Sequence, residues 1–214
     1  MPLPKLGTED GLLYRITRSI VRSLARVLFH LSADGLEHLP RTGPAILVPN
    51  HVSWLDPIVL PLVLPRKPAF LAMEELWRMP VVGTVMRAYG PLAIPLKRGT
   101  VDTSALKRAL ALLQQGALLI IFPEGGISPD GSLRRFHPGA ALLAARSDAP
   151  LIPVAVSGTR EALPLGSLMP RPRPITIRFG PAIVVESERR EDLRRALDRA
   201  AAQIRLLLEP LHRA

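Results

Sequence analysis

The chain has 214 residues and no cysteine, which excludes disulfides, thiolate zinc sites and a cysteine nucleophile. Its length suits one domain with a sizeable core, with or without a small appendage. The formal net charge of +10 predicts an anionic partner: nucleic acid, a phospholipid surface or a phosphorylated substrate. Aromatic residues, at 4%, are too sparse for the stacking surfaces of a single-strand nucleic-acid binder. The sequence predicts no membrane-spanning helix and no signal peptide, because it lacks both a run of 18 apolar residues and a basic–apolar–small N-terminal pattern.

The first predicted element is an amphipathic helix that begins near Thr8. Its apolar residues are Leu13, Ile16, Ile20, Val27 and Leu31. Spacings of three, four and four residues place four arginines on one face: Arg15, Arg18, Arg22 and Arg26. Such a helix suits the plane of an anionic bilayer, but an ordinary surface helix packed on its own domain has the same pattern. The predicted organisation is a membrane-associating helix in residues 1–33 and an α/β domain in residues 34–214.

The rest of the chain alternates strand-like and helix-like segments. Short apolar runs predict strands at residues 45–48, 69–72, 90–98, 117–122, 151–156 and 175–179. Helical spacing predicts helices at residues 57–64, 74–89, 103–115, 139–146 and 188–208. Residues 163–174, rich in proline and basic residues, are predicted to form a surface loop. This alternation predicts an α/β fold with a largely parallel central sheet flanked by helices.

His51 and Asp56 follow the predicted strand at residues 45–48, on the turn into a helix. Ligands bind at this end of the strands in α/β sheets. Histidine can take a proton from a hydroxyl near neutral pH, and a carboxylate within reach can orient its ring and stabilise the imidazolium. A structural alternative is a capping box, with Ser53 as the N-cap and Asp56 reaching back toward it.

Two further polar loops follow predicted strands. Lys97 and Arg98 end one strand, and Glu124 with Gly125 follows another. Two adjacent glycines, Gly125 and Gly126, permit the close backbone approach that ligand loops need, although a tight turn with a solvated glutamate would have the same sequence. We expect the three loops to gather at one edge of the sheet.

Four blocks in this order resemble the glycerol-phosphate acyltransferase superfamily, specifically its bacterial 1-acylglycerol-3-phosphate acyltransferases. Residues 50–56 match N-H-x-S-x-x-D, residues 90–98 match a glycine and apolar stretch ending in a basic residue, residues 122–139 match F-P-E-G, D-G-x-L and F-x-x-G, and residues 151–156 match an apolar run around a proline. The joint match is far more specific than any single block. One departure concerns the acceptor: Ile127 stands where the family commonly has arginine, so Arg134, Arg135 or Lys97 would have to replace it, or the acceptor differs.

The resemblance implies an acyltransferase that moves a fatty acyl group from acyl-CoA or acyl carrier protein to 1-acylglycerol 3-phosphate. His51 would be the general base and Asp56 its partner. Substrate would be bound by the residues Arg98, Lys97, Glu124, Gly125, Gly126 and Ser53. The expected partners are a lysophospholipid, an acyl thioester and an anionic membrane surface, without nucleic acid, cofactor or metal, at the cytoplasmic face of the cell membrane as a peripheral or monotopic protein. Alternatives are another lysophospholipid, glycerol 3-phosphate or an amino-acid lipid as acceptor, or a non-catalytic basic module that binds membranes or nucleic acid.

Overall fold

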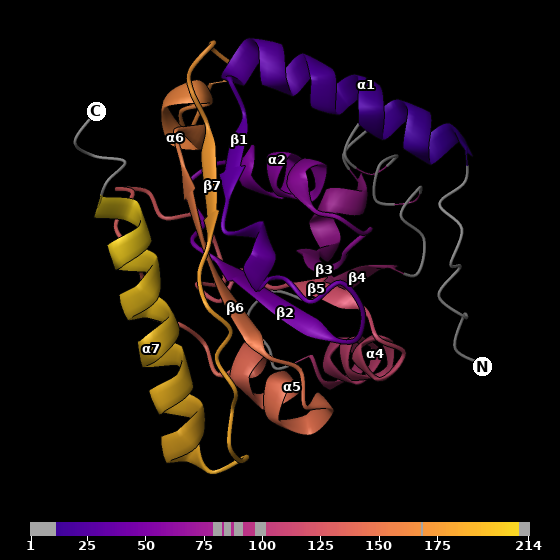
Figure 1. The fold of residues 1–214 in the computed structure, drawn as a ribbon, viewed down its shortest axis with the longest axis vertical. Coiled ribbons are helices and arrows are strands. Elements are labelled where there is room, and N and C mark those ends of the chain that lie inside the picture. The colour runs from indigo at the N-terminus through magenta and orange to yellow at the C-terminus, as the bar shows by residue number, and fades with distance from the viewer. Residues whose placement is uncertain are drawn as a thin grey trace.

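The structure is a computed structural model that describes residues 12–78, 83, 87, 92–96, 102–167 and 169–209. Its centre is a seven-stranded sheet in the order β1-β7-β6-β2-β5-β3-β4 (Figure 1). The strands are β1 Ser32–Asp34, β2 Ala45–Pro49, β3 Ala69–Met73, β4 Ala93–Leu96, β5 Leu118–Ile120, β6 Leu151–Ser157 and β7 Thr176–Phe179. Only the β6–β7 pair is antiparallel among these strands. The predicted α/β fold with a largely parallel sheet is therefore confirmed.

Helices cover both faces of the sheet. The α-helices are α1 Leu12–Phe29, α2 Asp56–Val63, α4 Thr103–Gln114, α5 Gly139–Ser147, α6 Thr159–Ala162 and α7 Arg190–Leu208. Two short 3₁₀ helices are η1 Leu36–His38 and η2 Glu74–Arg78. Successive side chains of strand β2 pack into the hydrophobic cores on the two faces of the sheet. Ile46 and Val48 pack with α4, α5 and α7, while Ala45 and Leu47 pack with α1 and α2. Side chains alternate across a strand, so a strand buried on both faces reads as one continuous apolar run.

Four segments differ from the prediction. Strand β1 and helix α6 were not predicted, because a three-residue strand with the sequence Ser-Ala-Asp and a single helical turn carry no periodic signal. The N-terminal helix ends at Phe29, where His30 adopts a φ of 43°, so Leu31 packs into the core outside the helix rather than on its apolar face. Of the helix predicted at residues 74–89, the described part contains η2, and most of the remainder lies outside the described residues.

Helix α1 turns its apolar face away from the protein. Six large apolar side chains are between 38% and 74% exposed: Ile16, Ile20, Val21, Leu24, Val27 and Leu28. The opposite side packs on the domain through the buried Ala25 and Phe29, and Arg18 donates from Nη2 to the Leu64 carbonyl at the end of α2. The helix therefore does pack on its own domain, but through the face opposite to the one an ordinary surface helix buries. No helix in the described part of the chain combines the length and apolarity needed to cross a bilayer.

Candidate active site

The turn that carries His51 is fixed to the neighbouring strand by Asn50. Asn50 is 3% exposed and follows β2, which pairs in parallel with β6. Its side-chain amide donates from Nδ2 to the Val156 carbonyl at 3.0 Å, and its Oδ1 accepts from the Val156 N–H at 2.7 Å. Through these two bonds the Asn50 side chain pairs with the backbone N–H and C=O of Val156, as the backbone of a further strand residue would. They hold the start of the turn where regular backbone pairing ends.

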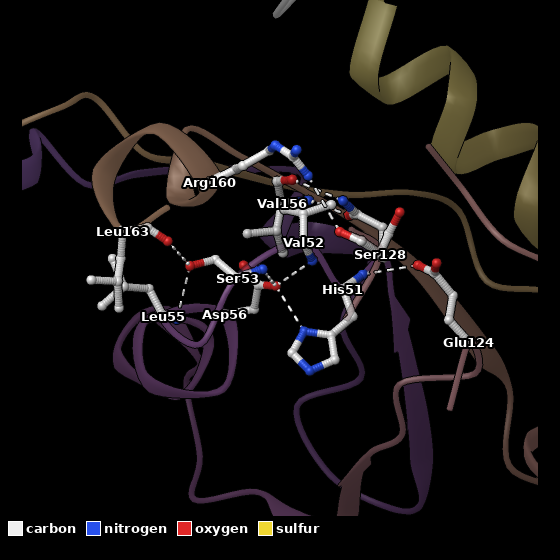
Figure 2. Close-up of polar contacts among 11 residues, drawn as sticks. His51, Val52, Ser53, Leu55, Asp56, Glu124, Ser128, Val156, Arg160 and Leu163 are labelled. Carbon is white, nitrogen blue, oxygen red and sulfur yellow. Dashed lines mark hydrogen bonds and ion pairs between the residues drawn. The ribbon is translucent and has the colours of Figure 1, made fainter. Parts of the chain in front are cut away.

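His51 and Asp56 form a close pair within this turn (Figure 2). His51 Nδ1 lies 2.8 Å from Asp56 Oδ2, and Asp56 is completely buried. The imidazole is stacked on the Phe122 ring, with centroids 4.1 Å apart and an interplanar angle of 30°. An ionised Asp56 selects the tautomer with hydrogen on Nδ1, which leaves the lone pair on Nε2 available. This is the arrangement of a general base oriented by a carboxylate.

Asp56 also organises the backbone of the turn. The same oxygen, Oδ2, accepts from the N–H groups of Val52 at 2.7 Å and Ser53 at 2.8 Å. The Ser53 hydroxyl accepts from the Leu55 N–H at 3.2 Å and donates to the Leu163 carbonyl at 3.0 Å, so it does not bond the backbone N–H that a capping box requires. Of the capping box, only the bond from the Ser53 N–H to Asp56 is present, and Asp56 makes it together with the bond to His51.

Glu124 links the two loops that meet at this edge. It is 3% exposed, and its Oε1 accepts from the His51 N–H at 2.9 Å while its Oε2 accepts from the Arg134 N–H at 3.0 Å. The alternative of a solvated glutamate in a tight turn is therefore wrong. Burial raises the pKa of Glu124 above the usual glutamate value, against the opposing effect of these two hydrogen bonds. Both oxygens are occupied by backbone groups, so Glu124 positions the His51 turn.

The glycines beside Glu124 allow the second loop to approach. Gly125 has a φ of +70°, and a Cβ there would lie 3.0 Å from the His137 ring. Gly126 has open space around it. Beyond them, the Ser128 N–H donates to the His51 carbonyl at 2.7 Å. The structure thus brings together the first and third sequence blocks at the carboxyl edge of β2 and β5.

The other predicted cations have different outcomes. Lys97 and Arg98 lie outside the described residues, although β4, which precedes them, is parallel to β3. The side chains of Arg134 and Arg135 are exposed. Arg160, which sequence reasoning missed, donates from Nη1 to the Ser128 carbonyl at 3.3 Å. No short-range pattern signals Arg160, because α6 and the loop meet only through the fold. The described residues contain no cluster of three or more histidine or acidic side chains that could hold a metal ion.

The fold and the site define an α/β protein with an oriented histidine at the carboxyl edge of parallel strands. A family model described as Acyltransferase matches residues 30–157, so the chain belongs to the acyltransferase family.

Named relatives agree with this membership. A chloroplast 1-acyl-sn-glycerol-3-phosphate acyltransferase of Arabidopsis thaliana is 36% identical over 142 residues, 65% of this chain and 39% of the relative. A lyso-ornithine lipid O-acyltransferase of Pseudomonas aeruginosa is 34% identical over 152 residues, 70% of this chain and 56% of the relative. The crystal structure of a 1-acyl-sn-glycerophosphate acyltransferase from Thermotoga maritima matches with a TM-score of 0.70 and 25% identity, covering 95% of this chain and 85% of that one. The chain spans less than two thirds of the length of the first curated relatives it matches.

Proposed function

We propose that this protein transfers a fatty acyl group from acyl-CoA or acyl carrier protein to the free hydroxyl of 1-acylglycerol 3-phosphate, forming phosphatidic acid. The observation that carries the proposal is the 2.8 Å contact between His51 Nδ1 and Asp56 Oδ2 within a turn held by two loops. Family membership and the relatives named as 1-acyl-sn-glycerol-3-phosphate acyltransferases support the reaction class.

In this mechanism His51 Nε2 takes the proton of the acceptor hydroxyl as its oxygen attacks the thioester carbonyl carbon. Asp56 stabilises the imidazolium that forms. The tetrahedral intermediate then collapses, the carbon–sulfur bond breaks, and the thiolate receives the proton from His51. Attack by the acceptor itself needs no covalent enzyme intermediate and no cofactor. An oriented general base of this kind contributes roughly 10²- to 10⁴-fold to a rate.

The acceptor's phosphate requires cations near the His51 turn. We assign this role to Arg98, by resemblance, and to Arg134. The Arg134 N–H donates to Glu124, which also accepts from the His51 N–H, and the Arg134 side chain is exposed. Arginine suits phosphate because its planar guanidinium donates two parallel hydrogen bonds. Arg134 would then replace the arginine that is absent at position 127.

One observation favours a second acceptor class. Ile127 is partly buried in the loop that contacts His51, where a phosphate-binding arginine is common in the family. A relative that covers 70% of this chain is named as acting on a lyso-ornithine lipid, whose headgroup is an amino acid. A lyso-amino-acid lipid is therefore the alternative acceptor for the same His51 chemistry.

Helix α1 supports docking on an anionic membrane surface, where the acceptor resides. Its six exposed apolar side chains suit insertion at the depth of the lipid headgroups. We place the protein peripherally on the cytoplasmic leaflet, where its net positive charge would attract anionic lipid rather than nucleic acid.

Acyl transfer in vesicles tests the proposed reaction. The wild-type protein is given a labelled acyl thioester and one of three acceptors: 1-acylglycerol 3-phosphate, the same lipid without phosphate, or lyso-ornithine lipid. We expect the phosphate-bearing acceptor to be fastest. A faster rate with lyso-ornithine lipid would select the alternative acceptor, and no transfer to any acceptor would contradict the reaction class.

Vesicle flotation tests the role of α1. Val27→Asp places a charge on a side chain that is 74% exposed on α1, and Leu206→Asp does the same at 63% exposure on α7. Only Val27→Asp is expected to weaken flotation with anionic vesicles. Equal flotation of the two variants would exclude α1 as the membrane contact.

A further inference from the structure

The loop of residues 163–174, described here without residue 168, is largely exposed, apolar and basic, and contacts hold its backbone near both ends. The Arg171 N–H donates to the Ala162 carbonyl at 2.7 Å, and the Ser167 N–H donates to the Pro164 carbonyl at 3.0 Å. At its end, the Pro174 carbonyl lies so near Gly158 that a Cβ there would be 1.9 Å from it. These contacts hold the loop backbone against the end of α6 and against Gly158.

The exposed side chains of this loop are large apolar residues and free cations. Met169 is 77% exposed, more than any other large apolar residue in the described part of the chain, and Leu165 is 41% exposed. Arg171 and Arg173 are exposed, and neither guanidinium has an ion-pair partner among the described residues. Apolar tips flanked by arginine are the composition that suits the boundary between lipid headgroups and acyl chains.

The loop lies at the edge of the sheet that carries the candidate active site. It begins at Leu163, whose carbonyl accepts the Ser53 hydroxyl at 3.0 Å. It is followed by Ile175, whose N–H donates to the Phe29 carbonyl at 2.8 Å, at the C-terminal end of α1. Figure 1 shows α1, α6 and the start of β7 at the same end of the sheet. The loop therefore connects the His51 turn to the C-terminal end of α1.

The His51 turn itself adds apolar surface. Trp54, in the turn before α2, is 44% exposed, and Ile58, in the first turn of α2, is 52% exposed. Tryptophan is favoured at membrane–water interfaces because its ring is apolar and its N–H is polar. Exposed apolar side chains thus occur on α1, on the loop and on the turn that carries the base.

We propose that the loop of residues 163–174 is a second membrane contact that inserts Leu165 and Met169 into an anionic monolayer and sets the His51 edge against the lipid. This proposal rests on the proposed function, because a membrane contact at this edge is useful if the acceptor is a lipid that enters the site from the membrane. The loop contact is separate from α1: α1 supplies a broad apolar face, and the loop fixes which edge of the domain faces the bilayer.

Two matched pairs of variants test the loop. Met169→Asp is compared with Val184→Asp, because Val184 is 71% exposed and follows Ile183, which pairs with Leu151 at the opposite end of β6. The double change Arg171→Glu and Arg173→Glu is compared with the same change at two exposed arginines of α7, Arg199 and Arg205. All six positions, three in the loop and three in the controls, are exposed, so the core is left intact.

Flotation with vesicles that contain anionic lipid measures the contact without requiring any chemistry. Met169→Asp is expected to weaken partition roughly tenfold, as loss of one inserted apolar side chain predicts, while Val184→Asp changes it less than twofold. The loop double charge reversal should weaken partition more than the α7 one, and this difference should shrink at high salt. Transfer to a long-chain acceptor in vesicles should fall with partition, whereas transfer to a short-chain acceptor dissolved as monomers should not change.

The outcomes separate this proposal from the proposed function. Unaltered flotation of Met169→Asp, or equal loss in Val184→Asp, would overturn the loop contact even if acyl transfer is normal. A Met169→Asp effect confined to the KM for an acyl carrier protein thioester would also overturn it, because the loop would then bind the donor protein. Absence of transfer in every assay would contradict the proposed function, while the flotation result would still decide the loop contact.

Discussion

Replacing Asp56 with asparagine separates catalysis from helix capping at one residue. Asp56 Oδ2 accepts three hydrogen bonds, from His51 Nδ1 and from the N–H groups of Val52 and Ser53, whereas the buried Oδ1 has no hydrogen-bond partner. In Asp56→Asn, an amide oxygen at the Oδ2 position can keep both backbone bonds. The new NH₂ group then occupies the buried Oδ1 position, which has no hydrogen-bond partner, and burying an unpaired NH₂ there costs about 1–3 kcal/mol of stability.

The loss of kcat/KM should be far larger than the small loss of folding stability could cause by lowering the amount of folded enzyme. The asparagine is neutral and cannot stabilise the imidazolium that forms as His51 takes the proton, so most of the contribution of the general base should disappear. We expect kcat/KM to fall by about 10²- to 10⁴-fold, the usual contribution of such a base. Thermal unfolding and acyl transfer measured on the same preparation test both values.

Ser53→Ala is the matched control, because it removes the bonds to Leu55 and Leu163 but leaves the His51–Asp56 contact in place. It should lower stability by about 1–2 kcal/mol and lower kcat/KM less than tenfold. The reasoning is refuted if Asp56→Asn loses stability but keeps kcat/KM within threefold of wild type. Asp56 would then be a structural residue of the turn.

Three further changes probe the frame of the site. Asn50→Ala removes both bonds to Val156 and leaves two buried backbone groups unpaired, so chemical denaturation should show a loss of about 2–4 kcal/mol; a loss below 0.5 kcal/mol would contradict the bridging role. Burial raises the pKa of Glu124, so its contribution to stability is full below the unfolded pKa and decreases as pH rises through the folded one. The stability gap between wild type and Glu124→Gln should therefore narrow as pH rises, and a gap that widens would reverse the sign of this argument. Arg134→Ala should raise the KM for 1-acylglycerol 3-phosphate about tenfold with little change for an acceptor without phosphate; equal changes for both would remove Arg134 from phosphate binding.

Much of the fold follows from local sequence. The runs at residues 45–48 and 151–156 are apolar and bounded by proline or polar residues, and both became central strands with small changes at their ends. Strand β1 has no such signal: its residues Ser32–Asp34 become a strand only by pairing with β7, where Ser32 lies opposite Thr176. Pairing between segments so far apart depends on the whole fold and leaves no periodic pattern.

The same distinction holds for the site. His51 and Asp56 are five residues apart across one turn, so their contact could be predicted from spacing and residue type. The bond from the His51 N–H to Glu124 spans 73 residues, and the bonds between Asn50 and Val156 span 106. These contacts exist only because β2, β5 and β6 end at one edge, and the sequence alone could place the residues there but not assign their partners.

Helix α1 shows a further limit. The spacing of its arginines and apolar residues predicts two faces, but both faces are compatible with packing and with lipid. Tertiary contacts decide between them: Arg18 bonds the Leu64 carbonyl, and Phe29 enters the core, so the opposite face remains exposed.

The central claim is that His51 is the general base of an acyl transfer. The most direct test measures phosphatidic acid formed from a labelled acyl thioester and 1-acylglycerol 3-phosphate in anionic vesicles, with wild type and His51→Ala at equal vesicle-bound concentration. The account predicts product with wild type and a loss of about 10²-fold or more in the variant, with folding and vesicle binding unchanged. Equal product from both proteins would contradict it.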